Sequence, residues 1–305
     1  MPLSLEEYRL GMLFSVSKAS ALETTGGQGV ELLVTRPFDD PQHGGAGVYT
    51  EKLLRIGRRL PLVLQKIIPS KQLDKLVLVE RCWNCFPKVK TAYECPFAKD
   101  FSMTIDTVCV DDDAGCAEEG HGLSPQEKAN CRVEVLDIFS IDKDQYRAEE
   151  DPTKVTFTKA ASRGPLVKGW AGSCQKIMCV YKTVKVHYPV RCSRTNENQL
   201  SCFVLTTPLL QVRGLQDTVE KIALKKGIQD VVHRFHRQMF CWMDEWIDLD
   251  DAAIQAFERD SAEAANSHFE EKGHELLSSG GSITVDVKAV STSELKGAEA
   301  ECGSA

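Results

Sequence analysis

The sequence has 305 residues, of which 42% are hydrophobic, and a formal net charge of -7 at pH 7. A chain of this length can bury a large core, and its acidity argues against a protein that binds nucleic acid through a basic surface. No apolar run reaches the roughly 18 residues of a membrane span. The N-terminus lacks the basic-then-apolar pattern of a secretory signal, so the 12 cysteines are interpreted as cytosolic thiols.

The first half of the chain predicts one helix followed by several strands. Ser4 and Glu7 form a capping box that begins a helix over residues 5–22. Apolar runs bounded by turn-forming residues predict strands at 30–36, 49–56, 75–83, 91–97 and 101–110, a polar loop at 37–47, a short apolar segment at 60–68 and an acidic loop at 111–122.

The second half continues with strands at 131–139 and 177–188, separated by a long polar stretch at 141–172. Consecutive strands with helices at both ends of the chain favour an α+β fold with an antiparallel sheet. The Ser-, Gly-, Ala- and Glu-rich tail at 278–305 predicts disorder.

A broad apolar stripe at helical spacing predicts a long helix over residues 215–246. The aspartates at 248–251 interrupt the stripe and favour the start of a second helix. Glu258 lies on the apolar side of that second helix, one turn after Ile254 and one turn before Ala262. Such a carboxylate lies either at the edge of the stripe, which is the commoner case, or against a polar partner inside.

Polar side chains fall on the otherwise apolar faces of five predicted strands. Residues two apart in a strand point to the same side, which places these polar residues inward: Thr50, Lys52, Glu80, Asn84, Thr91, Thr107 and Lys182. A buried charge is costly unless it is paired. Lysines with several hydroxyls suit a phosphate, and the aliphatic remainder of such a cavity suits a phospholipid. A one-residue error in strand register would instead turn all of these groups outward.

Signatures of enzymes and metal sites are weak or missing in the sequence. Cys82 and Cys85 form the only C-x-x-C motif, and no second pair or matching histidines complete a zinc site. There is no G-x-S-x-G, P-loop or H-E-x-x-H motif. His233 and His236 lie three apart on a helix without a third ligand and are interpreted as surface or packing residues.

A series of short motifs occurs in the order found in phosphatidylinositol transfer proteins. The motifs are TGGQGVELL, YTEK, WNCFP, AEEDP, SRGPL, MCVYK, RGLQDTVE and FHRQMFCWMDEW. The sequence resembles this family over residues 1–275, and its DPQHGGAGVYTEK and IMCVYK stretches are most similar to the soluble, retinal-degeneration-B-like branch. The resemblance implies a START-like helix-grip fold, in which a large concave antiparallel sheet and long helices enclose one phospholipid under a C-terminal lid helix.

The resemblance also implies the residues of a lipid site. The family's contacts to the inositol ring match Thr50, Lys52, Asn84 and Glu258, and its contacts to the lipid phosphate match Thr91, Thr107 and Lys182. No catalytic residue, no metal and no cofactor other than the bound phospholipid are implied. The lipids associated with the branch are phosphatidylinositol and phosphatidic acid.

Four departures from the family pattern bear on these expectations. Met12 stands where the family has a glutamine near the phosphate, so we expect phosphatidylcholine, a third candidate ligand, to bind only weakly. Val89 replaces a reactive cysteine. We expect no strand before the first helix, where the family usually has one, and we interpret residues 191–213 as an atypical insertion that removes a membrane-docking tryptophan. Real divergence and an error in the gene model are two alternative explanations of both departures. We expect a lipid-binding domain over residues 1–277, including that insertion.

The sequence therefore predicts a phospholipid transfer protein and not an enzyme. It would bind one phosphatidylinositol or phosphatidic acid molecule in an internal cavity and exchange it between membranes. The alternative is a lipid-sensing adaptor that uses the same cavity without net transfer. We expect a cytoplasmic monomer that associates transiently with the membrane surface and does not bind nucleic acid.

Overall fold

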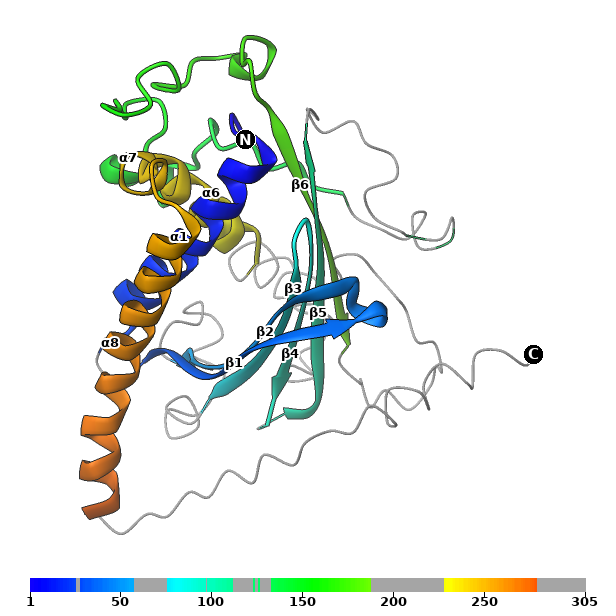
Figure 1. Cartoon of the computed structure of the whole chain (residues 1–305), viewed down its shortest axis with the longest axis vertical. Helices are drawn as coiled ribbons and strands as arrows, with labels where there is room; N and C mark the ends of the chain where they lie inside the picture. The colour runs from blue at the N-terminus through cyan, green and yellow to red at the C-terminus, as the bar shows by residue number, and fades with distance from the viewer. Residues whose placement is uncertain are drawn as a thin grey trace, which may run out of the picture. The chain divides into compact units, whose positions relative to one another are not determined.

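Figure 1 shows the computed structural model, which describes residues 1–25, 28–57, 76–96, 98–111, 123, 126, 133–187 and 228–278. The chain forms two compact units, Met1–Phe269 and Glu270–Ala305. The sheet and most of the helical structure belong to the first unit. Several predicted segments lie outside the described residues: the apolar segment 60–68, nearly all of the acidic loop 111–122, the insertion 191–213, the helical stripe before Ile228 and the tail after Ser278.

The described strands form one six-stranded antiparallel sheet whose strand order follows the chain from β1 to β6. The strands are β1 (Gly29–Asp40), β2 (Gly45–Arg55), β3 (Val77–Cys85), β4 (Lys88–Cys95), β5 (Ala98–Asp111) and β6 (Met178–His187). The strands predicted in these six places are confirmed. An antiparallel sheet with helices on one side also confirms the predicted α+β class of START-like, helix-grip kind (Figure 1).

The predicted polar loop at 37–47 is wrong, because this segment is a hairpin. β1 continues to Asp40, and a 3-10 turn, η1 (Pro41–His43), leads directly into β2. Asp40 accepts a hydrogen bond from the backbone N–H two residues on at 2.9 Å, and His43 Nδ1 lies 2.9 Å from the same carboxylate. Gly44 follows with φ of 101°, a left-handed conformation that glycine adopts without strain. These local bonds close a tight turn where the composition indicated an open loop.

The predicted strand at 131–139 is wrong for the part described, from residue 133 onward. Asp137 instead forms a turn, since its carboxylate accepts the backbone N–H of Phe139 and the indole N–H of Trp170, each at 3.0 Å. Val133 and Val135 are 75% and 89% exposed, so the alternating valines of this segment are not buried as those of a strand on the sheet would be. The polar stretch that follows contains the 3-10 helices η3 (Lys143–Gln145), η4 (Ala148–Glu150) and η5 (Trp170–Gly172).

Helix α1 (Leu5–Glu23) begins at the predicted capping box. The backbone N–H of Ser4 donates to the Glu7 carboxylate at 2.7 Å, and the Glu7 N–H donates to Ser4 Oγ at 3.4 Å. Arg163 holds the same carboxylate at 2.7 Å. The capping box therefore fixes both the start of α1 and its contact with the polar stretch.

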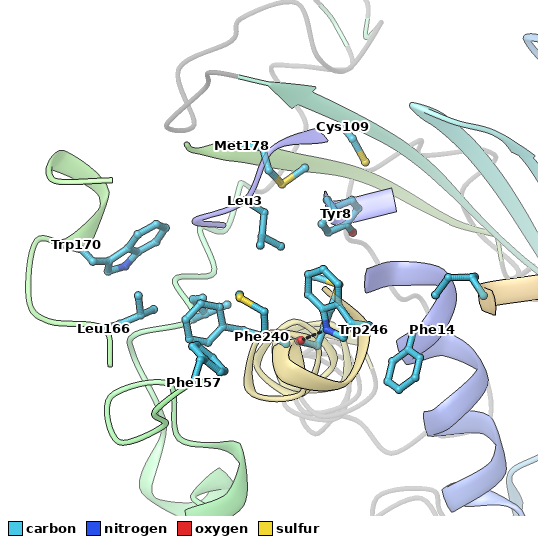
Figure 2. Packing of buried hydrophobic residues seen from close by; sticks show 14 residues of the cluster. Leu3, Tyr8, Phe14, Cys109, Phe157, Leu166, Trp170, Met178, Phe240 and Trp246 are labelled. Carbon is cyan, nitrogen blue, oxygen red and sulfur yellow. Dashed lines mark hydrogen bonds between the residues drawn. The ribbon is translucent and has the colours of Figure 1, made fainter. Parts of the chain in front are cut away.

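The helix predicted to run unbroken to Trp246 ends earlier. α6 (Asp230–Cys241) stops at Trp242, whose φ and ψ of -88° and 12° are not helical, and α7 (Met243–Trp246) follows. The break lets the indole N–H of Trp246 donate to the carbonyl of Met239 at 2.9 Å, as Figure 2 shows. α8 (Asp251–Ser278) then begins at the aspartates, as predicted.

The main core packs α1, α6 and α7 against the sheet (Figure 2). Trp246 is fully buried, and a β-carbon on Gly11 would lie 2.9 Å from its ring, so this glycine permits the close approach of α1. Cys109 of β5 and Met178 of β6 belong to the same core. A second cluster joins Val184 of β6 to Ile228, and Val232 of α6 packs against it. We call the sheet face that carries Cys109, Met178 and Val184 the inner face.

Candidate functional site

The sheet register places the predicted strand residues on the inner face. Directly opposed residues of antiparallel strands point to the same side. Three rows of opposed residues cross β2 to β6: the Lys182 row (Val48, Asn84, Val89, Thr107, Lys182), the Thr50 row (Thr50, Cys82, Thr91, Ile105, Val184) and the Lys52 row (Lys52, Glu80, Tyr93, Met103, Val186). Val184 lies on the inner face, and the two neighbouring rows are each two residues away along the strands. Six of the predicted site residues therefore share that face, and the outward register is excluded.

The amine of Lys182 lies among neutral groups. Its ammonium donates to the hydroxyl of Thr107 at 3.1 Å, and Thr107 is buried. Burial lowers the pKa of Lys182, while the thiols of Cys109 and Cys82 oppose this shift. Burial in turn raises the pKa of Cys109 to about 11, so this thiol is not an anion near neutral pH. In the part of the chain that the structure describes, no carboxylate contributes to the pKa shift of Lys182.

His236 of α6 adds a further neutral group near Lys182. Its Nδ1 lies 2.7 Å from the carbonyl of Val232 and its Nε2 lies 3.1 Å from the hydroxyl of Tyr8. Nδ1 therefore donates to the carbonyl, and Nε2 accepts from the tyrosine. Burial lowers the pKa of His236 to about 3, and the charge of Lys182 is the second largest cause of this shift. The interpretation of this histidine as a packing residue is confirmed.

The Lys52 row carries opposite charges side by side. Lys52 Nζ lies 3.6 Å from Glu80 Oε1, and the two side chains are only 18% and 14% exposed. Tyr93 lies opposite Glu80 on β4. Burial, together with Glu80, raises the pKa of the Tyr93 hydroxyl well above its ordinary value, so the hydroxyl stays protonated and can donate.

Glu258 approaches this row from α8 and not from the sheet. Partial burial raises the pKa of its carboxyl group, and the positive charge of Lys52 opposes that shift. The partly buried carboxylate is therefore within electrostatic reach of Lys52, which favours a polar partner inside over a place at the edge of the stripe. The charge of Lys52 acts on carboxylates of both β3 and α8.

Asn84 presents an unsatisfied acceptor on the inner face. Its Oδ1 is buried and has no hydrogen-bond partner within the residues that the structure describes. Such an orphan costs about 1–3 kcal/mol unless a bound group satisfies it. The carbonyl of Asn84 lies only 2.3 Å from where a β-carbon on Gly47 would be, so glycine at position 47 permits the pairing of β2 and β3 that places Asn84.

Cys82 lies between two predicted ligand-binding threonines, opposite Thr50 on one side and Thr91 on the other. Burial raises the pKa of this thiol, with Glu80 contributing and the Thr91 hydroxyl opposing. The sequence assigned no role to Cys82 or to Tyr93. Glu80 was assigned to the correct face by the period of two, but its contact with Lys52 could not be predicted from one strand alone.

The inner face can therefore bind an anion beside a polyol. Lys182, Thr107 and Thr91 offer a charge and hydroxyl donors, whereas the Lys52 row and Asn84 offer a mixture of donors and acceptors. Among the described residues, no group of His, Cys, Asp and Glu side chains is placed to hold a metal ion. None of the described helices combines the length and apolarity needed to cross a bilayer.

A family model described as phosphatidylinositol transfer protein matches residues 1–201 and 191–263. The chain belongs to the phosphatidylinositol transfer protein family. The family is one of lipid transfer proteins, not of enzymes. The resemblance drawn from the sequence motifs is confirmed.

Relatives of this family match most of the chain. Phosphatidylinositol transfer protein 1 of Dictyostelium discoideum is 36% identical over 278 residues, which cover 89% of this chain and 94% of the relative. Cytoplasmic phosphatidylinositol transfer protein 1 of Drosophila melanogaster is 32% identical over 268 residues, 87% of each chain. Human membrane-associated phosphatidylinositol transfer protein 2 is 34% identical over 86% of this chain, which spans only 18% of that relative.

Proposed function

We propose that the protein binds one molecule of phosphatidylinositol or phosphatidic acid against the inner face and exchanges it between membranes. The observation that carries this proposal is Lys182. A cation among neutral groups, beside the Thr107 hydroxyl, needs an anionic partner. A lipid phosphate would supply that partner, with Thr107 and Thr91 donating hydrogen bonds to its remaining oxygens.

The inositol ring would lie against the Lys52 row and Asn84. Each ring hydroxyl can both donate and accept a hydrogen bond, so it suits a site of mixed polarity. Lys52 and Thr50 would donate to ring oxygens, while Glu258 and the orphan Oδ1 of Asn84 would accept from ring hydroxyls. Glu80 joins this set by its contact with Lys52. Phosphatidic acid, which lacks the ring, would use the phosphate contacts alone.

The names of the relatives support a place in the cell as well as a lipid. The Dictyostelium and Drosophila proteins are named for phosphatidylinositol transfer, and the second is named as cytoplasmic. We propose that this chain likewise acts as a cytoplasmic monomer that binds a membrane surface during exchange. Transfer of labelled lipid between vesicles would separate a carrier from a lipid-sensing adaptor, because only the carrier speeds the exchange.

Protein purified from cells is expected to contain one phospholipid per chain. Native mass spectrometry, followed by lipid extraction, measures both the stoichiometry and the headgroup, and we expect phosphatidylinositol as the main species. Lys182→Ala protein, purified in parallel, should contain much less lipid. A wild-type preparation without any phospholipid would overturn the proposed function.

Met12 is expected to disfavour phosphatidylcholine. It is partly buried on α1 and packs against the main core. A thioether is only a weak acceptor, whereas a glutamine amide donates hydrogen bonds to a phosphate. Met12→Gln should raise the transfer of phosphatidylcholine several-fold, and Met12→Leu, which keeps the volume without the amide, should not. Strong phosphatidylcholine transfer by the unmodified protein would contradict this prediction.

A further inference from the structure

Glu258 is the one predicted headgroup residue that is not on the sheet, so its position depends on how α8 is held. The first part of α8 contacts α1. The ring of Phe257 stacks on Phe14 with centroids 4.4 Å apart, and Asp251 pairs with Arg9 at 2.6 Å. These contacts hold α8 to another helix and leave its position against the inner face to be set elsewhere.

Asn266 fastens α8 directly to the sheet. Its Oδ1 accepts the backbone N–H of Leu32 at 2.9 Å, and its Nδ2 donates to the carbonyl of Leu32 at 2.9 Å. β1 is an edge strand among the described strands (Figure 1), and an edge strand presents backbone donors and acceptors without a neighbouring strand. The side-chain amide makes with Leu32 the two bonds that the backbone of another strand would make.

The fastening point lies in the row that Glu258 approaches. Leu32 is paired with Lys52 across β1 and β2, immediately before the irregularity between Leu32 and Val34. Lys52 is also the sheet residue whose charge acts on Glu258. Asn266 follows Glu258 by eight residues, or about 12 Å of helix. One end of this helical segment is thus bound to Lys52's strand partner, and the carboxylate at its other end lies within electrostatic reach of Lys52.

We infer that Asn266 is a positioning residue. Its two hydrogen bonds to Leu32 set where Glu258 lies relative to Lys52 and so favour phosphatidylinositol over lipids without an inositol ring. The inference rests on the proposed function. Asn266 touches no part of the headgroup itself and acts through Glu258. Phe269, whose ring lies 4.9 Å from the Arg55 guanidinium of β2, supports the same end of the segment.

Asn266→Ala tests the inference with little risk to the helix, since alanine is a better helix former than asparagine. Two readouts are expected to change. Hydrogen exchange at the Leu32 amide should become at least about fivefold faster, because the amide loses its acceptor. The ratio of phosphatidylinositol to phosphatidic acid transfer should fall by about fivefold or more. Ser267→Ala, at an exposed neighbouring position, should change neither.

A double-mutant cycle separates positioning from a general effect on the lid. If Asn266 acts through Glu258, then adding Asn266→Ala to Glu258→Ala should lower the lipid ratio no further. Wild-type exchange at Leu32 in Asn266→Ala would overturn the fastening, and an unchanged lipid ratio with faster exchange would overturn the positioning role. A wild-type protein that takes up neither lipid would overturn the proposed function itself and the positioning role with it, whereas the exchange measurement would still report the Leu32 bond.

Discussion

Replacing Lys182 by alanine is expected to lower the affinity for both phosphatidylinositol and phosphatidic acid by roughly 10- to 150-fold, the loss of one charge-assisted hydrogen bond. The phosphate is the group that the two lipids share. Without the Lys182 ammonium, the phosphate would lie in the protein interior facing hydroxyls and thiols alone. Transfer of each labelled lipid between vesicles, measured in separate assays, shows how much the substitution weakens the handling of that lipid.

Thr50→Ala is the matched comparison, because Thr50 is proposed to meet the inositol ring only. It should lower phosphatidylinositol transfer by about five- to 150-fold and spare phosphatidic acid. Lys90→Ala, an exposed lysine on the same sheet, controls for the loss of a positive charge. The delipidated Lys182→Ala protein should melt no lower than the delipidated wild type, since burial disfavours the charged lysine.

Two outcomes would contradict this assignment of phosphate and ring contacts. One is wild-type transfer of both lipids by Lys182→Ala. The other is equal loss of both lipids in Thr50→Ala at an unchanged melting temperature, which would mean that Thr50 does not distinguish the ring from the phosphate.

Glu150→Ala is expected to reduce the free energy of unfolding by about 3–5 kcal/mol, the usual effect of removing one partner of a buried ion pair. Glu150 is 4% exposed and accepts from Arg234 at 2.8–3.0 Å and from Gln238 at 2.9 Å. Arg237, which is 1% exposed, lies 4.0 Å away. Its Nε and Nη1 have no partner within the described residues, and Glu150 is the carboxylate with the largest effect in offsetting its buried charge.

The unfolding free energy can be measured by chemical denaturation of the delipidated protein. Glu149→Ala, at the exposed preceding position, should stay within about 0.5 kcal/mol of the wild type. A loss below about 1 kcal/mol for Glu150→Ala would mean that this cluster does not hold η4 against α6. Lipid transfer by the surviving folded protein should remain selective, because Glu150 contacts none of the inner-face rows.

The residues of the inner face could be predicted from sequence because side chains of a strand alternate strictly between its two sides. Once Lys182 shares a face with Val184, and Thr107 with Ile105, the side of every such residue is fixed within its strand. Which residues of different strands then meet is a matter of register. The contact of Lys52 with Glu80 and the place of Cys82 between two threonines follow from pairings that no single strand encodes.

Two of the wrong predictions, an unbroken helix to Trp246 and a strand at 131–139, fall where side-chain hydrogen bonds accompany a different backbone path. The apolar stripe runs through Trp242 without interruption, yet the helix breaks there and the Trp246 indole bonds to Met239. Residues 133–139 alternate like a strand, but the Asp137 carboxylate forms a turn that also binds the Trp170 indole. In neither case does residue type within a short window carry the information.

The partners of α8 are the least local of these features. The sequence around Asn266 gives no sign of a special role for this helix residue. Its hydrogen bonds to Leu32 join positions 234 residues apart. The helical stripe drew attention to Glu258 as an anomaly but could not name Lys52 as its neighbour. A charged residue on an apolar helical side indicates that a partner exists, and only the fold identifies the partner.

The two hydrogen bonds between Asn266 and Leu32 would also affect how many molecules have α8 displaced from the sheet, which we call the open form, during the proposed exchange. Two neutral hydrogen bonds contribute about 1–3 kcal/mol together, so on their own they would favour the closed form over the open one by roughly five- to 150-fold. Should the proposed lipid exchange require α8 to move away, the backbone groups of Leu32 would become a free strand edge, which other chains can pair with. Within that proposal, the two hydrogen bonds would limit both the release of the lipid and the exposure of the strand edge to self-association.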